Sequence, residues 1–147
     1  MNILFIGTTG IHHTLIAAHL YLGSLNDENY SDLEYWGDWA SEALGLPLFL
    51  DYDDVGNRVY VLGVGWDVQM AQKAIEQLEE LLSSDLQSLI VKPVFIKREI
   101  VLLFLHRVGR RKKLNRLVQT LITSLLKKEF ITIQKQVEKF RERVRFV

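Results

Sequence analysis

The chain has 147 residues, of which 48% are hydrophobic and 10% aromatic, and this composition excludes an intrinsically disordered protein. It contains no cysteine, which excludes disulfides and thiolate metal sites. The net charge of zero conceals an asymmetry, because residues 1–90 carry fourteen acidic and two basic side chains, whereas residues 91–147 carry sixteen basic and four acidic ones. Such asymmetry fits a basic region that binds nucleic acid or an anionic membrane. It also fits two halves of one domain that pack together and neutralise each other, and we favour this interpretation.

The chain begins directly with an apolar run and has no basic segment before it, so we expect no signal peptide. The longest uninterrupted apolar run, residues 100–105, is too short to span a bilayer. We therefore predict a cytoplasmic protein without a transmembrane segment.

The first ninety residues alternate strand-like and helix-like patterns. Residues 2–7 predict a strand buried on both faces, and a helix follows from His13 or Thr14 to about Leu22. Ser31 and Glu34 have the spacing of a capping box, which predicts a short helix through residues 36–44.

Residues 48–50 and 58–64 predict two strands joined by a polar turn, which favours an antiparallel pair. A helix is predicted over residues 68–82 with Asp67 as its N-cap.

In the basic half, residues 89–96 predict a strand in which Pro93 favours an edge position or an interruption. Periodicity does not decide whether residues 100–105 form a helix or a strand. Residues 114–144 predict a long basic helix. Its apolar positions recur in a heptad-like seam of Leu126, Phe130, Ile133, Val137, Phe140 and Val144.

These patterns predict a single α/β domain over residues 1–147, with three layers around a mainly parallel or mixed sheet of Rossmann-like type. Residues 110–147 would form a helical C-terminal extension that packs on this domain.

The segment after the first strand, loop 7–14, is the principal candidate site. It has the length of a Walker A loop, but His12 replaces the second glycine and His13 replaces the lysine, which argues against a P-loop NTPase. A looser anion site remains, because a helix N-terminus offers free N–H groups and hydroxyls. An ordinary capped turn is the alternative.

We expect His12 to act as the catalytic residue in proton or phosphoryl transfer, since a histidine titrates near neutrality. Asp51, at the end of a predicted strand, would orient the ligand. The other ligand-binding candidates are Gly7, Thr8, Thr9, Gly10, His13 and Thr14. His12 and His19 with Asp51 or Asp53 could supply metal ligands, but their spacing fixes no geometry and we predict no metal site.

A second feature is segment 107–116, which is rich in arginine and lysine. It could contact nucleic acid, a phospholipid surface or the acidic half of the chain. The segment has no aromatic residue for base stacking, which disfavours a specific RNA site.

The order of motifs resembles a family of small uncharacterised proteins from Firmicutes, grouped as a domain of unknown function. The motifs are Thr9-Gly10-Ile11-His12-His13-Thr14, Ala17-Ala18, Leu22-Gly23, Leu46-Pro47, the run from Gly56 to Gly63, and Arg107-Val108-Gly109. Members have a Gly-Gly-x-His-Ser-Ser type loop after the first strand. His12 matches its histidine and Thr14 its last hydroxyl residue, while Thr9 stands for a glycine and His13 for a serine. The resemblance implies a cytoplasmic bacterial protein and supplies no activity or cofactor.

The sequence therefore predicts binding of a small phosphorylated or anionic ligand at loop 7–14, without deciding whether the protein is an enzyme. The alternative is an interaction or regulatory protein whose basic C-terminal helix binds a partner or a second copy.

Overall fold

A computed structural model of the chain describes residues 1–25, 29–82 and 88–146. Its centre is a four-stranded sheet in the order β2-β3-β1-β4. The strands are β1 (Asn2–Gly7), β2 (Leu48–Tyr52), β3 (Arg58–Gly63) and β4 (Leu89–Pro93). β1 is parallel to both β3 and β4, and β2 is antiparallel to β3. The sheet is thus mixed, and the predicted antiparallel pair is confirmed.

The central strand β1 is buried on both faces, as its continuous apolar run predicts. Ile3 and Phe5 belong to the larger hydrophobic core, whereas Leu4 and Ile6 pack with Val68 on the opposite face. Successive side chains of a strand point to opposite faces, so one apolar hexapeptide contributes to two cores.

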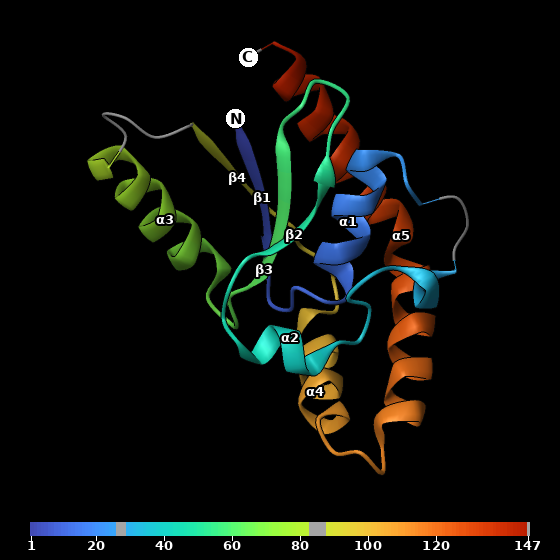
Figure 1. The fold of residues 1–147 in the computed structure, drawn as a ribbon. Helices are drawn as coiled ribbons and strands as arrows, with labels where there is room; N and C mark the ends of the chain where they lie inside the picture. The colour runs from blue at the N-terminus through green and yellow to red at the C-terminus, as the bar shows by residue number, and fades with distance from the viewer. Residues whose placement is uncertain (26–28, 83–87, 147) are drawn as a thin grey trace.

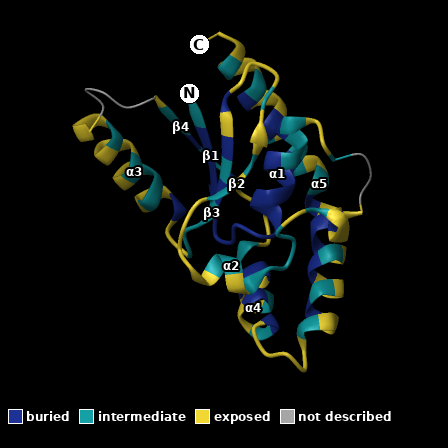
Figure 2. Ribbon diagram, in the orientation of Figure 1, coloured by how far each residue is buried: buried dark blue, intermediate teal, exposed yellow. Residues whose placement is uncertain are grey.

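Helices cover both faces of the sheet (Figure 1). α1 (His13–Leu22) and α5 (Asn115–Arg145) lie on one face, and α3 (Val68–Leu82) lies on the other. α2 (Trp39–Ala43) and α4 (Glu99–Gly109) lie beyond the end of the sheet where the parallel strands finish. Figure 2 shows that buried residues concentrate in β1, α1 and the inner face of α5. The chain is a single α/β domain.

The predicted capping box at Ser31 is wrong, although a short helix, α2, does form within residues 36–44. Residues Tyr30–Asp32 form one 3-10 turn, and α2 begins eight positions after Ser31, where Asp38 accepts a hydrogen bond from the Ser41 N–H at 3.1 Å. Tyr35 and Gly37 adopt positive φ angles of 68° and 65° between the two elements. A right-handed helix cannot pass through such residues.

The ambiguous segment after β4 is helical. β4 ends at Pro93 on the edge of the sheet, as the proline predicts, and α4 begins at Glu99. The Glu99 carboxylate accepts a hydrogen bond from the Ile96 N–H at 3.0 Å, which satisfies a donor just before the helix.

The C-terminal helix α5 is continuous over 31 residues, and its apolar seam faces the chain's own core. The buried residues of the seam are Leu126, Ile133, Val137 and Phe140. These side chains are therefore occupied within the molecule and not free to form a coiled coil. In the described ranges, no helix is long and apolar enough to cross a membrane.

Candidate functional site

Loop 7–14 lies at the carboxyl end of β1 and leads directly into α1. Its residues are buried, and Thr9, Ile11, His12, His13 and Thr14 have no exposed surface. His12 occupies the N-cap position of α1, but its side chain does not cap the helix. The loop is therefore neither an open phosphate cradle nor a turn capped by its own side chain.

One carboxylate, that of Glu42 on α2, already binds the backbone of this loop. The Gly10 N–H donates to Glu42 Oε1 at 2.6 Å, and His106 Nε2 lies 2.8 Å from Glu42 Oε2. A Cβ on Gly63 would collide with the same carboxylate and would come 2.7 Å from the Gly10 nitrogen. The glycine at the end of β3 thus makes room for a side chain of the protein itself.

A second carboxylate, that of Glu99 on α4, lies on the other side of the loop. Glu99 Oε2 accepts from the Thr8 hydroxyl at 2.7 Å, and Glu99 Oε1 lies 3.6 Å from His13 Nε2. A Cβ on Gly7 would collide with the His13 and Thr14 side chains. Two glutamates and three histidines therefore converge at this edge of the sheet, and we call His12, His13, Glu42, Glu99 and His106 the His–Glu cluster.

His12 is enclosed by aromatic rings rather than directed toward solvent. Its ring centroid lies 5.2 Å from those of Trp36 and Trp39 and 5.5 Å from that of His106. Burial lowers the pKa of His12 well below 6.5, and the neighbouring His106 and His13 lower it further. His12 is therefore neutral at physiological pH and presents no positive charge to an anion.

Burial also lowers the pKa of His13, although the Glu99 carboxylate and the Val94 backbone carbonyl act in the opposite direction. Desolvation is the largest cause, so His13 is held as a neutral imidazole between α4 and the loop.

The accessible part of the cluster is a pocket of about 480 Å³ between α2 and α4, which we call the α2–α4 pocket. Glu42 of α2 and His106 of α4 both line it, and Arg110 lies at the end of α4. Its full lining is Trp39, Ala40, Glu42, Ala43, His106 and Arg110. A smaller cavity of about 310 Å³ reaches Thr8 and Glu99 from the side of α3.

The structure corrects the expectation for Asp51. Asp51 pairs with Val59, which in turn pairs with Ile3 near the beginning of β1. Because β2 runs antiparallel to its neighbour, the end of this strand lies at the opposite edge of the sheet from loop 7–14. Asp51 is exposed there and does not reach the His–Glu cluster.

His19 is likewise separate from His12, since it lies near the far end of α1, where its Nδ1 is 2.7 Å from the Ser24 hydroxyl. The remaining predicted residues of loop 7–14 do lie together.

Sequence reasoning missed Glu42, Glu99 and His106. Two of them have a weak signal: His106 follows an apolar run, and Glu99 is the first acidic residue of the basic half. A histidine inside an apolar helix must find a polar partner when it is buried, and this partner is Glu42.

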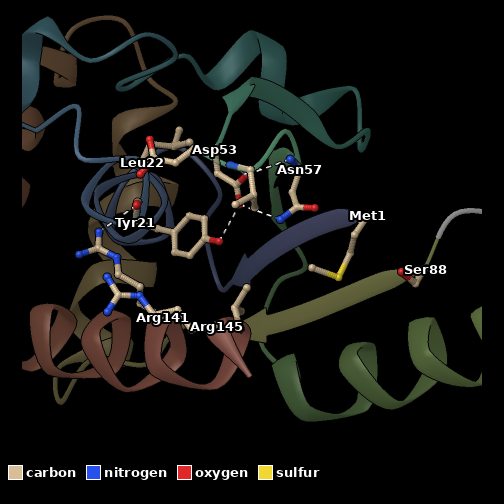
Figure 3. A pocket seen from close by; sticks show the side chains of 11 residues that line it. Met1, Tyr21, Leu22, Asp53, Asn57, Ser88, Arg141 and Arg145 are labelled. Carbon is tan, nitrogen blue, oxygen red and sulfur yellow. Dashed lines mark hydrogen bonds between the residues drawn. The ribbon is translucent and has the colours of Figure 1, made fainter. Parts of the chain in front are cut away.

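A further cavity, of about 680 Å³, lies near the chain termini, at the end of the sheet opposite loop 7–14 (Figure 3). The Tyr21 hydroxyl donates to Asp53 Oδ2 at 2.8 Å, and Arg141 donates to the Leu20 and Tyr21 carbonyls. Burial acts to raise the pKa of Asp53, but hydrogen bonds from Asn57 and Tyr21 hold it below its ordinary value. These polar groups bind one another and join α1 and α5 to the turn between β2 and β3. We therefore assign this network a structural role.

No curated protein and no solved structure shows significant similarity to the chain. A family model does match, and it covers residues 2–142. The chain therefore belongs to the DUF3189 family of proteins of unknown function.

Proposed function

We propose that this protein binds a small phosphorylated or otherwise anionic ligand in the α2–α4 pocket, directly beside loop 7–14. The observation that carries the proposal is the short hydrogen bond from the Gly10 N–H to Glu42 Oε1, 2.6 Å long. The loop amide already holds an anionic oxygen, and an oxygen of the ligand would take its place.

In this proposal Glu42 moves aside when the ligand binds. It belongs to the five-residue helix α2, which contributes no buried residue to the core. Moving its side chain would release both the Gly10 N–H and His106 Nε2 toward the pocket. Arg110, which is exposed at the mouth, would add a guanidinium that can bind a phosphate through two parallel hydrogen bonds.

Proton transfer in this proposal belongs to His106 rather than to His12. His106 lines the pocket, and its Nε2 lies 2.8 Å from Glu42 Oε2, so this ring nitrogen is placed to exchange a proton with a ligand oxygen that replaces the carboxylate. His12 positions the His106 and Trp39 rings through edge contacts.

Isothermal titration calorimetry of the full chain tests the proposal with inorganic phosphate, pyrophosphate, nucleotides and sugar phosphates. We expect Arg110→Gln to weaken binding by roughly tenfold or more, because a charge-assisted hydrogen bond is lost. Arg111→Gln is the matched control, since Arg111 is an exposed neighbour outside the pocket lining.

Glu42→Gln sharpens the test. The amide keeps an acceptor for the Gly10 N–H but removes the negative charge that competes with the ligand, so anions should bind more tightly. Absence of binding by every ligand to both the wild type and Glu42→Gln would refute the proposal.

A further inference from the structure

The turn between α4 and α5 forms the tip of a helical hairpin that projects away from the sheet (Figure 1). Every arginine and lysine of this tip is exposed: Arg107, Arg110, Arg111, Lys112, Lys113 and Arg116. The sequence contains no acidic residue between Glu99 and Glu129. The tip is therefore the most concentrated positive charge of the chain.

The described part of the acidic half does not neutralise this charge through ion pairs. Within residues 1–25, 29–82 and 88–146, side-chain ion pairs include His13–Glu99 and His106–Glu42. Among the described residues, no ion pair joins an arginine or lysine of the tip to an acidic side chain. The positive potential of the hairpin is thus available to a partner.

Both arms of the hairpin also expose large apolar side chains. On α4, Ile100 and Phe104 are 69% and 65% exposed, and on α5 Leu117 is 61% exposed. Ile100, Phe104 and Arg107 are spaced by four and three positions, so they share one side of α4. That side changes from apolar to basic toward the tip.

We propose that the α4–α5 hairpin docks on an anionic membrane surface. The arginines and lysines of the tip bind lipid phosphates and carboxylates, while Phe104 and Leu117 enter the boundary between headgroups and acyl chains. The chain termini lie at the opposite end of the molecule (Figure 1), so docking leaves the sheet in water.

The composition of the hairpin favours a lipid surface over a nucleic acid. A duplex backbone needs basic side chains but gains nothing from exposed aliphatic ones. Single strands stack on aromatic rings, and Phe104 is the only Phe, Tyr or Trp between residues 99 and 121. Basic charge beside exposed apolar surface is the combination that an anionic bilayer complements.

Sedimentation of the full chain with vesicles tests this proposal. We expect binding to phosphatidylcholine vesicles that contain phosphatidylserine, weak binding to phosphatidylcholine alone, and a loss of binding at high salt. The triple variant R111Q/K112Q/K113Q should lose roughly a hundredfold in partitioning, because each base near an anionic surface contributes about fivefold.

The matched control is K135Q/K139Q/R143Q, which removes the same charge from exposed positions on α5 far from the tip. It should stay within about fivefold of the wild type, since those charges lie beyond a Debye length from a docked surface. Equal losses in both triple variants would overturn the proposal, because they would show a response to net charge alone.

The variant F104S/L117S tests the contribution of the apolar side chains to vesicle binding. Its matched control is L78S/L81S, which removes two leucines of α3 that are 57% and 82% exposed. The hairpin variant should lose at least tenfold in partitioning and the α3 variant should not. Circular dichroism verifies that both are folded. Equal binding to neutral and anionic vesicles would overturn the proposal. So would tighter binding to an RNA or DNA oligonucleotide, or a dimer that R111Q/K112Q/K113Q dissociates.

Discussion

Acidification from about pH 7.5 to about pH 5.5 should destabilise the fold through its buried histidines. Burial lowers the pKa of His12 and of His13, whereas in the unfolded chain each histidine titrates near its ordinary value of 6.5. Below pH 6.5 the unfolded state therefore binds more protons than the folded state, and stability falls as the pH falls. Well above pH 6.5, both histidines are neutral in the folded and the unfolded state, so they cause no loss of folding stability.

The size of the effect follows from linkage. A histidine that stays neutral in the folded protein lowers the free energy of unfolding by about 1.4 kcal/mol at pH 5.5, one unit below its unfolded pKa. His12 and His13 together can therefore account for up to roughly 2.8 kcal/mol, and His12, the more strongly shifted of the two, for about half of that. Such a loss is a large fraction of the stability of a typical domain.

Urea unfolding followed by tryptophan fluorescence measures this loss directly, because Trp36 and Trp39 lie 5.2 Å from the His12 ring. His12→Gln should reduce the difference between the two pH values by about 1.4 kcal/mol, whatever it does to absolute stability. Hydrogen bonds hold the pKa of Asp38 below its ordinary value, so that carboxylate does not titrate in this window. The same free energy of unfolding at both pH values would refute the assignment of neutral buried histidines.

Three substitutions probe other parts of the structure. Gly63→Ala should displace Glu42 from the loop and destabilise the fold by about 2 kcal/mol or more in thermal melts, because the new methyl occupies the position of the carboxylate; unchanged stability would contradict this packing. Asp38→Ala removes the N-cap of α2 and should cost about 1 kcal/mol in urea titrations, with Asp38→Asn retaining most of the stability. Tyr21→Phe removes a hydrogen bond to a carboxylate and should cost roughly 1.5–3 kcal/mol in urea titrations, and a neutral effect would argue against this bond.

Several elements could be read from the sequence because local patterns specify them. The apolar run at residues 2–7 forms the central strand, and the Met70 N–H donates to Asp67 Oδ1 at 3.0 Å, as the predicted N-cap requires. Pro93 ends a strand at the sheet edge. In each case the determining atoms lie within a few residues of one another, so periodicity and capping chemistry suffice.

The sequence by itself thus determined an α/β domain with a histidine-bearing loop after its first strand. Only the tertiary structure decided what surrounds that loop. Glu99 binds Thr8 from 91 positions away and Glu42 binds Gly10 from 32, and the direction of β2 carries Asp51 to the opposite edge. Such contacts depend on strand order and helix packing, which local sequence patterns do not specify. The same packing encloses His12 completely and leaves His106, which is 5% exposed, lining a pocket, because the neighbours in space decide which ring borders a cavity.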